Sequence, residues 1–100
     1  IAKYELKIQD EDIINAVKYH TTGKEDMTLL EKIVYMADLI EEDRDFPSVN
    51  LLRELTYSGN LDEALLISFD NTIKFVIENK QLIHLRTVEA RNYLMQQKSL

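Results

Sequence analysis

Apolar residues recur along most of the chain at intervals of three and four positions, the spacing of one face of an α-helix. Two glycines and a single proline interrupt this pattern, and each lies between two apolar periods. The fold class expected is therefore all-α, a bundle of about five helices with short connections. The segment 1–8 is expected to be the tail of a further helix. The five expected helices cover residues 10–21, 28–43, 48–57, 61–79 and 86–97.

Local signals mark several of these helix ends. Thr28 and Glu31 form the S/T-x-x-E pattern of a capping box, and Asn60 with Glu63 follows the same logic before the fourth helix. Gly23 follows the first helix, where a left-handed residue commonly ends a helix. The apolar stripe of the fourth helix is too wide to be half exposed. The expected apolar faces are Leu29, Leu30, Ile33, Met36, Ala37 and Ile40 on the second helix, and Leu65, Leu66, Phe69, Ile73, Val76 and Ile77 on the fourth.

The composition excludes several classes of protein. A chain of 100 residues is one small domain or part of one, and residues 1–100 contain no internal boundary. The absence of cysteine excludes disulfides and thiolate zinc sites. No apolar run approaches the roughly 20 residues of a transmembrane helix, and no signal peptide is visible, so a cytoplasmic location fits best. A net charge of −6 makes the chain a poor candidate for binding nucleic acid.

The acidic charge is concentrated between residues 25 and 45. Eight acids and two bases fall in this window, so it carries the whole net charge of −6. A solvated face is the simplest interpretation. However, Glu41, Glu42 and Asp43 lie at the expected C-terminal end of the second helix, where each opposes the helix dipole by up to about 1 kcal/mol. An offsetting group is therefore expected, either Arg44, another neighbouring base or a bound cation.

Two carboxylates of this window lie beside the apolar face of the second helix. Counting about 100° per residue from Ile33, Glu41 falls at about 80° and Asp38 at about 140°. A carboxylate on an apolar flank must be paired, protonated or bound to a metal, because burying the bare charge costs too much. Asp38 and Glu41 project to the same side because they are three residues apart.

The two histidines differ in their expected surroundings. His20 falls on the apolar face of the first helix, beside Ile13, Ala16 and Val17. It is either a buried histidine bonded to a backbone carbonyl or a metal ligand, and the pattern leaves both interpretations open. His84 lies in a turn and is expected to be a surface or helix-capping residue.

Several segments taken together resemble a known family. The pairing of YHTTG (residues 19–23) with ADLIE (residues 37–41) carries most of the specificity. These segments resemble the bacterial YqeK group of HD-domain phosphohydrolases, and the resemblance covers nearly the whole chain. The family is all-α and hydrolyses diadenosine tetraphosphate symmetrically to two ADP at a dinuclear metal site. The matching segments are residues 18–24, 27–33, 37–41, 44–47, 70–74, 82–84 and 87–94.

The resemblance implies roles for two residues. His20 corresponds to the second intervening histidine of the HD pattern, and Asp38 to the late aspartate that closes the site. Both would be metal ligands, and Asp38 the catalytic residue. The early histidine, the His-Asp doublet and the first intervening histidine would precede Ile1. The chain is thus expected to be the C-terminal half of the domain, without its N-terminal helices and inactive alone. The implied cofactor is a divalent transition metal in a dinuclear centre, with iron or manganese favoured and the identity unassigned.

Further site residues are less specific candidates. Glu41 is expected to orient a metal ligand or a water beside the metal, because it lies on the same side of the helix as Asp38. The family often has Pro-Gly where positions 42 and 43 carry Glu-Asp, which leaves the role of Arg44 open. Helix-end capping and solvated charge remain the alternative for the candidate phosphate contacts. These candidates are Thr21, Thr22, Lys24 and Arg44.

The expected partner is a nucleotide substrate, a dinucleoside polyphosphate, with no nucleic acid and no membrane. A homodimer is a candidate assembly, because half a domain would expose apolar surface. One alternative is a non-enzymatic acidic helical interaction module, in which His20 and Asp38 are structural and the acidic window docks a basic partner. Another is an HD phosphohydrolase acting on a different nucleotide, since fold does not fix the substrate.

Overall fold

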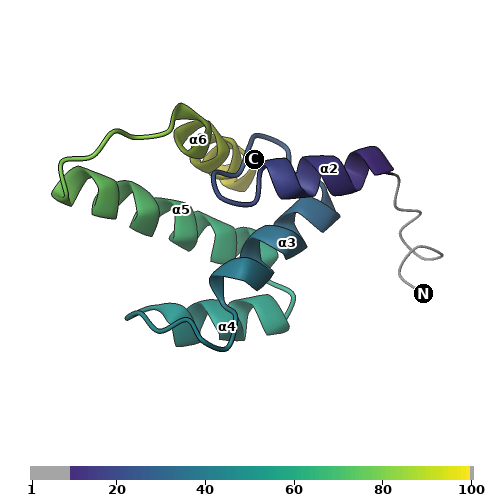
Figure 1. Ribbon diagram of the computed structural model, residues 1–100, viewed down its shortest axis with the longest axis horizontal. Helices are drawn as coiled ribbons and strands as arrows, with labels where there is room; N and C mark the ends of the chain where they lie inside the picture. The colour runs from purple at the N-terminus through teal and green to yellow at the C-terminus, as the bar shows by residue number, and fades with distance from the viewer. Residues whose placement is uncertain (1–9, 100) are drawn as a thin grey trace.

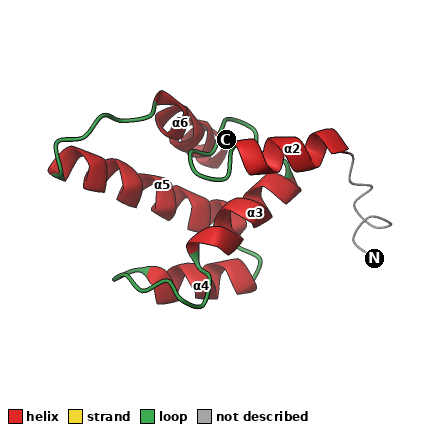
Figure 2. Cartoon of the chain, in the orientation of Figure 1, coloured by secondary structure: helices red, strands yellow, loops and turns green. Residues whose placement is uncertain are grey.

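The computed structural model describes residues 10–99, which form five helices and no strand (Figures 1 and 2). This confirms the all-α fold class and the number of helices. The helical tail expected over residues 1–8 lies outside the described residues. None of the helices described is both long and apolar enough to cross a bilayer. The helices are α2 (Asp10–Lys18), α3 (Leu29–Leu39), α4 (Val49–Tyr57), α5 (Leu61–Glu78) and α6 (Leu85–Ser99).

Two helices end earlier than their apolar period predicts. α2 ends at Lys18, and the expected residues 19–21 form a turn that closes when the Gly23 N–H donates to the Tyr19 carbonyl (2.9 Å). α3 ends at Leu39 rather than at residue 43, because a side chain from α4 binds the carbonyls that would continue it. The remaining ends lie within two residues of their predicted positions.

The two predicted capping boxes have opposite outcomes. The one at α3 is confirmed: the Glu31 N–H donates to Thr28 Oγ1 (3.2 Å), and the Thr28 N–H donates to Glu31 Oε1 (2.8 Å). The one at α5 is wrong. Asn60 is the N-cap residue, but its amide donates to Ser58 Oγ (2.9 Å) instead of accepting from the helix. The Asn60 side chain therefore binds Ser58, which is nearer, and does not cap the N-terminus of α5.

The N-terminal half of α5 forms the centre of the core. It packs against α3, α4 and α6 (Figure 1). Phe69 and Leu65 are completely buried there, together with Met36 from α3 and Leu52 from α4. The Tyr35 ring meets Phe69 edge to face at 5.2 Å, a favourable aromatic geometry. Burial raises the pKa of the Tyr35 hydroxyl to about 12, although its hydrogen bond with Thr72 acts in the opposite direction.

The loop after α2 is fixed tightly against this core. Gly23 has φ of +73°, and a Cβ at this position would lie 2.7 Å from two ring atoms of Phe69. Only glycine satisfies both the left-handed backbone and the close approach. Thr87 of α6 adds a hydrogen bond from its hydroxyl to the Thr22 carbonyl (2.9 Å). The turn that carries His20 is therefore anchored to α5 and α6.

The predicted apolar faces of α2 and α3 are only partly buried, which corrects the sequence interpretation. On α2, Ala16 is buried, whereas Ile13 and Val17 are 50% and 61% exposed. On α3, the predicted positions Met36 and Ile40 lie in the core, whereas Leu29, Ile33 and Ala37 are exposed. Residues 10–99 therefore leave part of each predicted face uncovered.

The wide stripe of α5 is buried over only part of its length. Leu65, Leu66 and Phe69 lie in the core, as predicted, whereas Ile73 and Val76 are only half-buried and Ile77 is 58% exposed. The C-terminal half of α5 extends beyond α3 and α4 (Figure 1). The expectation that the whole stripe is buried is therefore wrong for the described part of the chain.

Candidate functional site

The imidazole of His20 is oriented by the helix that precedes it. Its Nδ1 is hydrogen-bonded to the carbonyl of Val17. Because a carbonyl oxygen only accepts, Nδ1 carries the proton, and the lone pair of the neutral ring lies on Nε2. The ring is half-buried rather than enclosed in the core. The bond to a backbone carbonyl agrees with the expectation of a structural histidine. The lone pair on Nε2 agrees with the alternative of a metal ligand, since the N–H opposite the metal-binding nitrogen of such a histidine commonly donates a hydrogen bond in this way.

Asp38 lies on the exposed side of α3 and is paired. Arg44 Nη2 stands 3.5 Å from Asp38 Oδ2, and both side chains are about half exposed. Pairing, one of the three states expected for this carboxylate, is thus observed, although the flank on which it lies is open to solvent. The long contact leaves Oδ1 of Asp38 available to another group. No hydrogen bond or ion pair joins Asp38 to His20 within residues 10–99.

The acidic run after α3 is held by an arginine that the sequence patterns above do not single out. Arg53 of α4 donates through Nε to the Ile40 carbonyl (3.0 Å) and through Nη2 to the carbonyls of Glu41 and Arg44 (both 2.9 Å). A neighbouring base was one of three expected offsets for the acids, and Arg53 is such a base, although it binds the backbone carbonyls of this segment. No local pattern could identify it, since it belongs to the next helix.

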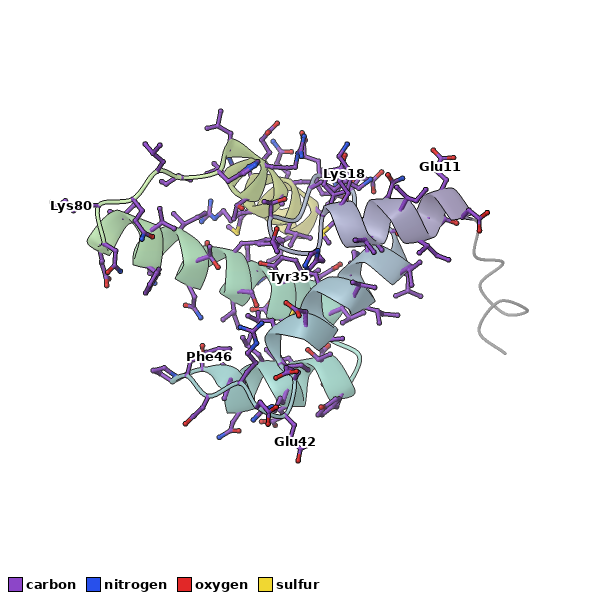
Figure 3. All side chains as sticks on the ribbon, in the orientation of Figure 1. Glu11, Lys18, Tyr35, Glu42, Phe46 and Lys80 are labelled. Carbon is purple, nitrogen blue, oxygen red and sulfur yellow. The ribbon has the colours of Figure 1, made fainter. Side chains whose placement is uncertain are left out.

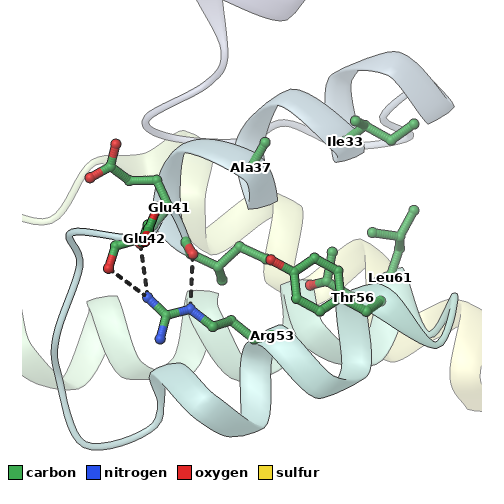
Figure 4. A pocket seen from close by; sticks show the side chains of 9 residues that line it. Ile33, Ala37, Glu41, Glu42, Arg53, Thr56 and Leu61 are labelled. Atoms are coloured by element: carbon green, nitrogen blue, oxygen red, sulfur yellow. Dashed lines mark hydrogen bonds between the residues drawn. The ribbon is translucent and has the colours of Figure 1, made fainter.

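Glu41 lies beyond the end of α3, not on it. Its side chain is exposed and lines a hollow of about 800 Å³ between α3 and α4, with Ala37 and Ile33 on one wall and Arg53 on the other (Figure 4). No hydrogen bond or ion pair joins its carboxylate to Asp38 or His20 in the described part of the chain. The support that Glu41 would give to a metal therefore stays a prediction.

The candidate phosphate contacts differ in whether their side chains already bind other groups of the protein. Thr21 is exposed, whereas the Thr22 hydroxyl donates to the Gly23 carbonyl (3.0 Å). The ammonium group of Lys24 lies 3.1 Å from Glu31 Oε2, and this glutamate is 1% exposed. Lys24 thus neutralises a buried carboxylate, a structural role that neither interpretation of this residue foresaw, and its contact with phosphate stays a prediction. Arg44 is engaged with Asp38 by the long contact described above.

Three cationic groups surround Tyr19, the residue before His20. Lys18 Nζ, Lys24 Nζ and the Arg86 guanidinium lie 5.2, 5.0 and 4.9 Å from the centre of its ring, within the range of cation–π attraction. Arg86 comes from α6 and is remote in sequence, so no local pattern associates it with this turn.

The donors of His20 and Asp38 fit a transition metal, but they form only part of a site. An imidazole nitrogen with a carboxylate oxygen is a donor set that iron, manganese and zinc accept. Within residues 10–99 there is no group of three or more histidine, cysteine, aspartate or glutamate side chains that could hold a metal ion. The described residues therefore supply at most two ligands, and the remaining ones would have to come from elsewhere.

The chain is similar to known proteins over almost its whole length. It is 41% identical over 95 residues to the "Bis(5'-nucleosyl)-tetraphosphatase, symmetrical" of Bacillus subtilis (strain 168). The aligned region covers 95% of this chain and 50% of that protein. The protein of the same name from Staphylococcus aureus (strain NCTC 8325 / PS 47) is 36% identical over 94 residues, covering 93% of this chain and 48% of that protein. No family model matches the chain.

A solved structure gives the same result for the fold. The crystal structure of a "predicted HD superfamily hydrolase involved in NAD metabolism" from Clostridium acetobutylicum matches with a TM-score of 0.85 and 52% identity, over 96% of this chain and 50% of that one. The chain therefore spans about half the length of the curated relatives it matches. The YHTTG and ADLIE segments lie within this similarity. By sequence and by fold, the chain matches the C-terminal half of YqeK-type HD-domain hydrolases.

Proposed function

We propose that this chain supplies the C-terminal half of a metal-dependent hydrolase that cleaves dinucleoside polyphosphates symmetrically. The observation that carries the proposal is the orientation of His20, whose Nδ1 is bound to the Val17 carbonyl and whose Nε2 is left to bind a metal. The names of the relatives support the substrate class. Diadenosine tetraphosphate, cleaved to two ADP, is the substrate to test first.

The residues of this chain would hold and orient the reacting groups. The backbone carbonyl of Val17 fixes the His20 ring, and the contact between Gly23 and Phe69 fixes the turn that carries it. Arg44 restrains the Asp38 carboxylate and brings a positive charge to the side on which a phosphate would approach. A divalent transition metal held by His20 and Asp38, with iron or manganese favoured, would polarise a phosphoryl oxygen and lower the pKa of a bound water.

The exposed apolar faces support the view that the site is completed by another polypeptide segment. Ile14 and Val17 on α2 and Ile33 on α3 leave apolar surface uncovered. Exposed apolar patches of this kind usually mark an interface. In the proposed enzyme this surface is covered by the half that the relatives have in addition, and that half provides the other ligands. The chain alone is therefore expected to be inactive.

The test is a fusion of the N-terminal half of the Bacillus subtilis relative to this chain. Release of ADP from diadenosine tetraphosphate is measured with Mn²⁺ or Fe²⁺ for the fusion and for the chain alone. The proposal predicts metal-dependent release by the fusion only, and a loss of at least about 100-fold in His20→Ala and Asp38→Ala, as for residues central to metal catalysis.

His84→Ala is the matched control, because His84 accepts a hydrogen bond from the Arg86 N–H and lies outside the proposed site. This variant should retain the activity of the fusion. A folded fusion that stays fully active without His20 and Asp38 would disprove the metal-ligand roles and favour the interaction module. Hydrolysis of another nucleotide in preference to diadenosine tetraphosphate would revise the substrate alone.

A further inference from the structure

A second hollow lies between the loop after α3 and the C-terminal half of α5. Its volume is about 550 Å³, within the range of about 300 to 1,000 Å³ that is usual for small-molecule sites. Phe46, labelled in Figure 3 on the loop that leads to α4, contributes to one wall. The residues that matter for its chemistry are Leu39, Phe46, Ser48, Asn71, Thr72 and Phe75.

Two aromatic side chains give this hollow a surface suited to a flat ring. Phe46 is half-buried and packs against the core, so its position is fixed. Phe75 is 59% exposed although it is a large apolar residue. Aromatic side chains in such positions stack on nucleobases, and each stacked base is worth about 1–3 kcal/mol. The walls of the hollow therefore favour a planar aromatic ligand over a purely aliphatic one.

One polar side chain of the hollow, Asn71, is already oriented. The Asn71 amide donates one N–H to Ser48 Oγ (2.9 Å), which fixes its plane. Its second N–H and its Oδ1 remain available as a donor and an acceptor side by side. Adenine presents the complementary pair at N7 and the N6 amino group, whereas guanine presents two acceptors at N7 and O6. Asn71 thus selects adenine over guanine.

Two residues of the hollow are close in sequence to residues that the proposed function assigns to the metal and the phosphates. Leu39 in its wall follows Asp38 directly, and Phe46 is two residues from Arg44.

We propose that this hollow binds the adenine base of a nucleotide, with Phe46 and Phe75 stacking on the ring and Asn71 bonding to N7 and the N6 amino group. Its link to the phosphates rests on the proposed function, whereas recognition of the base does not. Thr72, which is hydrogen-bonded with Tyr35, also lines the hollow.

The experiment measures binding of adenosine and of guanosine to the chain by calorimetry, without metal. Adenosine carries no phosphate, so the result is independent of hydrolysis. Adenosine should bind at least about tenfold more tightly than guanosine, because one bidentate contact is worth about 1–3 kcal/mol. Phe75→Ala and Asn71→Asp should each weaken adenosine binding by about tenfold or more.

Tyr57→Ala is the matched control, because Tyr57 is an aromatic residue, 77% exposed, that lines the other hollow. It should leave adenosine binding unchanged. Circular dichroism of each variant checks the fold, and Phe75→Ala should retain it because the side chain is mostly exposed. Absence of adenosine binding by the wild-type chain, equal binding of guanosine, or loss in Tyr57→Ala alone would overturn the proposal. If the active fusion kept its KM for diadenosine tetraphosphate with Phe75→Ala, the pocket would be wrong while the hydrolase function stood.

Discussion

Replacing Gly23 by alanine tests how the turn that carries His20 is held. Gly23 and Gly59 both adopt left-handed backbone conformations, with φ of +73° and +86°. They differ in their surroundings. A Cβ at Gly23 would meet the Phe69 ring at 2.7 Å, whereas nothing lies within 4 Å of a Cβ at Gly59. The pair therefore separates the cost of the backbone conformation from the cost of the steric clash.

The expected magnitudes follow from these two terms. A non-glycine residue in the left-handed region costs about 1–2 kcal/mol. Alanine recovers about 0.4–1 kcal/mol by restricting the unfolded chain, so Gly59→Ala should lower the free energy of unfolding by roughly 1 kcal/mol. Overpacking costs typically about 1–3 kcal/mol more, and Phe69 is completely buried and cannot easily move. Gly23→Ala should therefore lower the free energy of unfolding by about 2–4 kcal/mol.

Urea denaturation followed by circular dichroism measures both variants against the wild-type chain. With a slope of about 1–3 kcal/mol per M urea, the midpoint of Gly23→Ala should fall by roughly 0.3–3 M below that of Gly59→Ala. In the active fusion, Gly23→Ala should also lower hydrolysis, because the displaced turn carries His20. Equal midpoints for the two variants would refute the close contact between the turn and Phe69.

Three further predictions concern charges and the buried tyrosine. Arg53→Gln should lower the free energy of unfolding by about 2 kcal/mol, because it removes charge-assisted bonds to the carbonyls after α3. Arg44→Gln, at an exposed and longer contact, should change it by less than about 1 kcal/mol. Urea midpoints compare the two variants, and equal effects would contradict the capping role of Arg53. Lys24→Met should lower the free energy of unfolding by about 1–3 kcal/mol in the same assay, because Glu31 would be left buried without its cation. An unchanged urea midpoint would contradict this structural role of Lys24. The pKa of Tyr35 is about 12 in the folded chain, against an ordinary value of 10.0, so its stabilising contribution is complete below pH 10 and is lost as the pH rises toward 12. Ultraviolet titration should find one tyrosine ionising near pH 12. Ionisation of every tyrosine near pH 10 in the folded chain would contradict the burial of Tyr35.

Features set by neighbouring residues were predicted well from the sequence. The capping box of Thr28 and Glu31 formed because its partners are three residues apart and have no closer competitor. The same reasoning failed at Asn60, where Ser58 was the nearer partner. Gly23 was correctly assigned a left-handed conformation, but its contact with Phe69 is long-range and has no local signature.

The site was predictable where motifs define it and not where it depends on other helices. His20 and Asp38 were selected by the YHTTG and ADLIE segments, and their metal-binding roles remain predictions. Arg53 was missed because it reaches the end of α3 from the next helix. The apolar period placed Ile33 and Val17 on the apolar side of their helices, but periodicity does not tell which segment covers that side.

Metal binding by His20 and Asp38 is the hypothesis on which the proposed function depends. The decisive experiment is the metal content of the purified fusion after loading with Mn²⁺ or Fe²⁺, determined by elemental analysis for the wild type, His20→Ala, Asp38→Ala and the control His84→Ala. We expect two metal ions per fusion in the wild type and the control, and a clear reduction in each of the other two variants with helix content unchanged. Two tightly bound ions in both His20→Ala and Asp38→Ala would contradict the hypothesis.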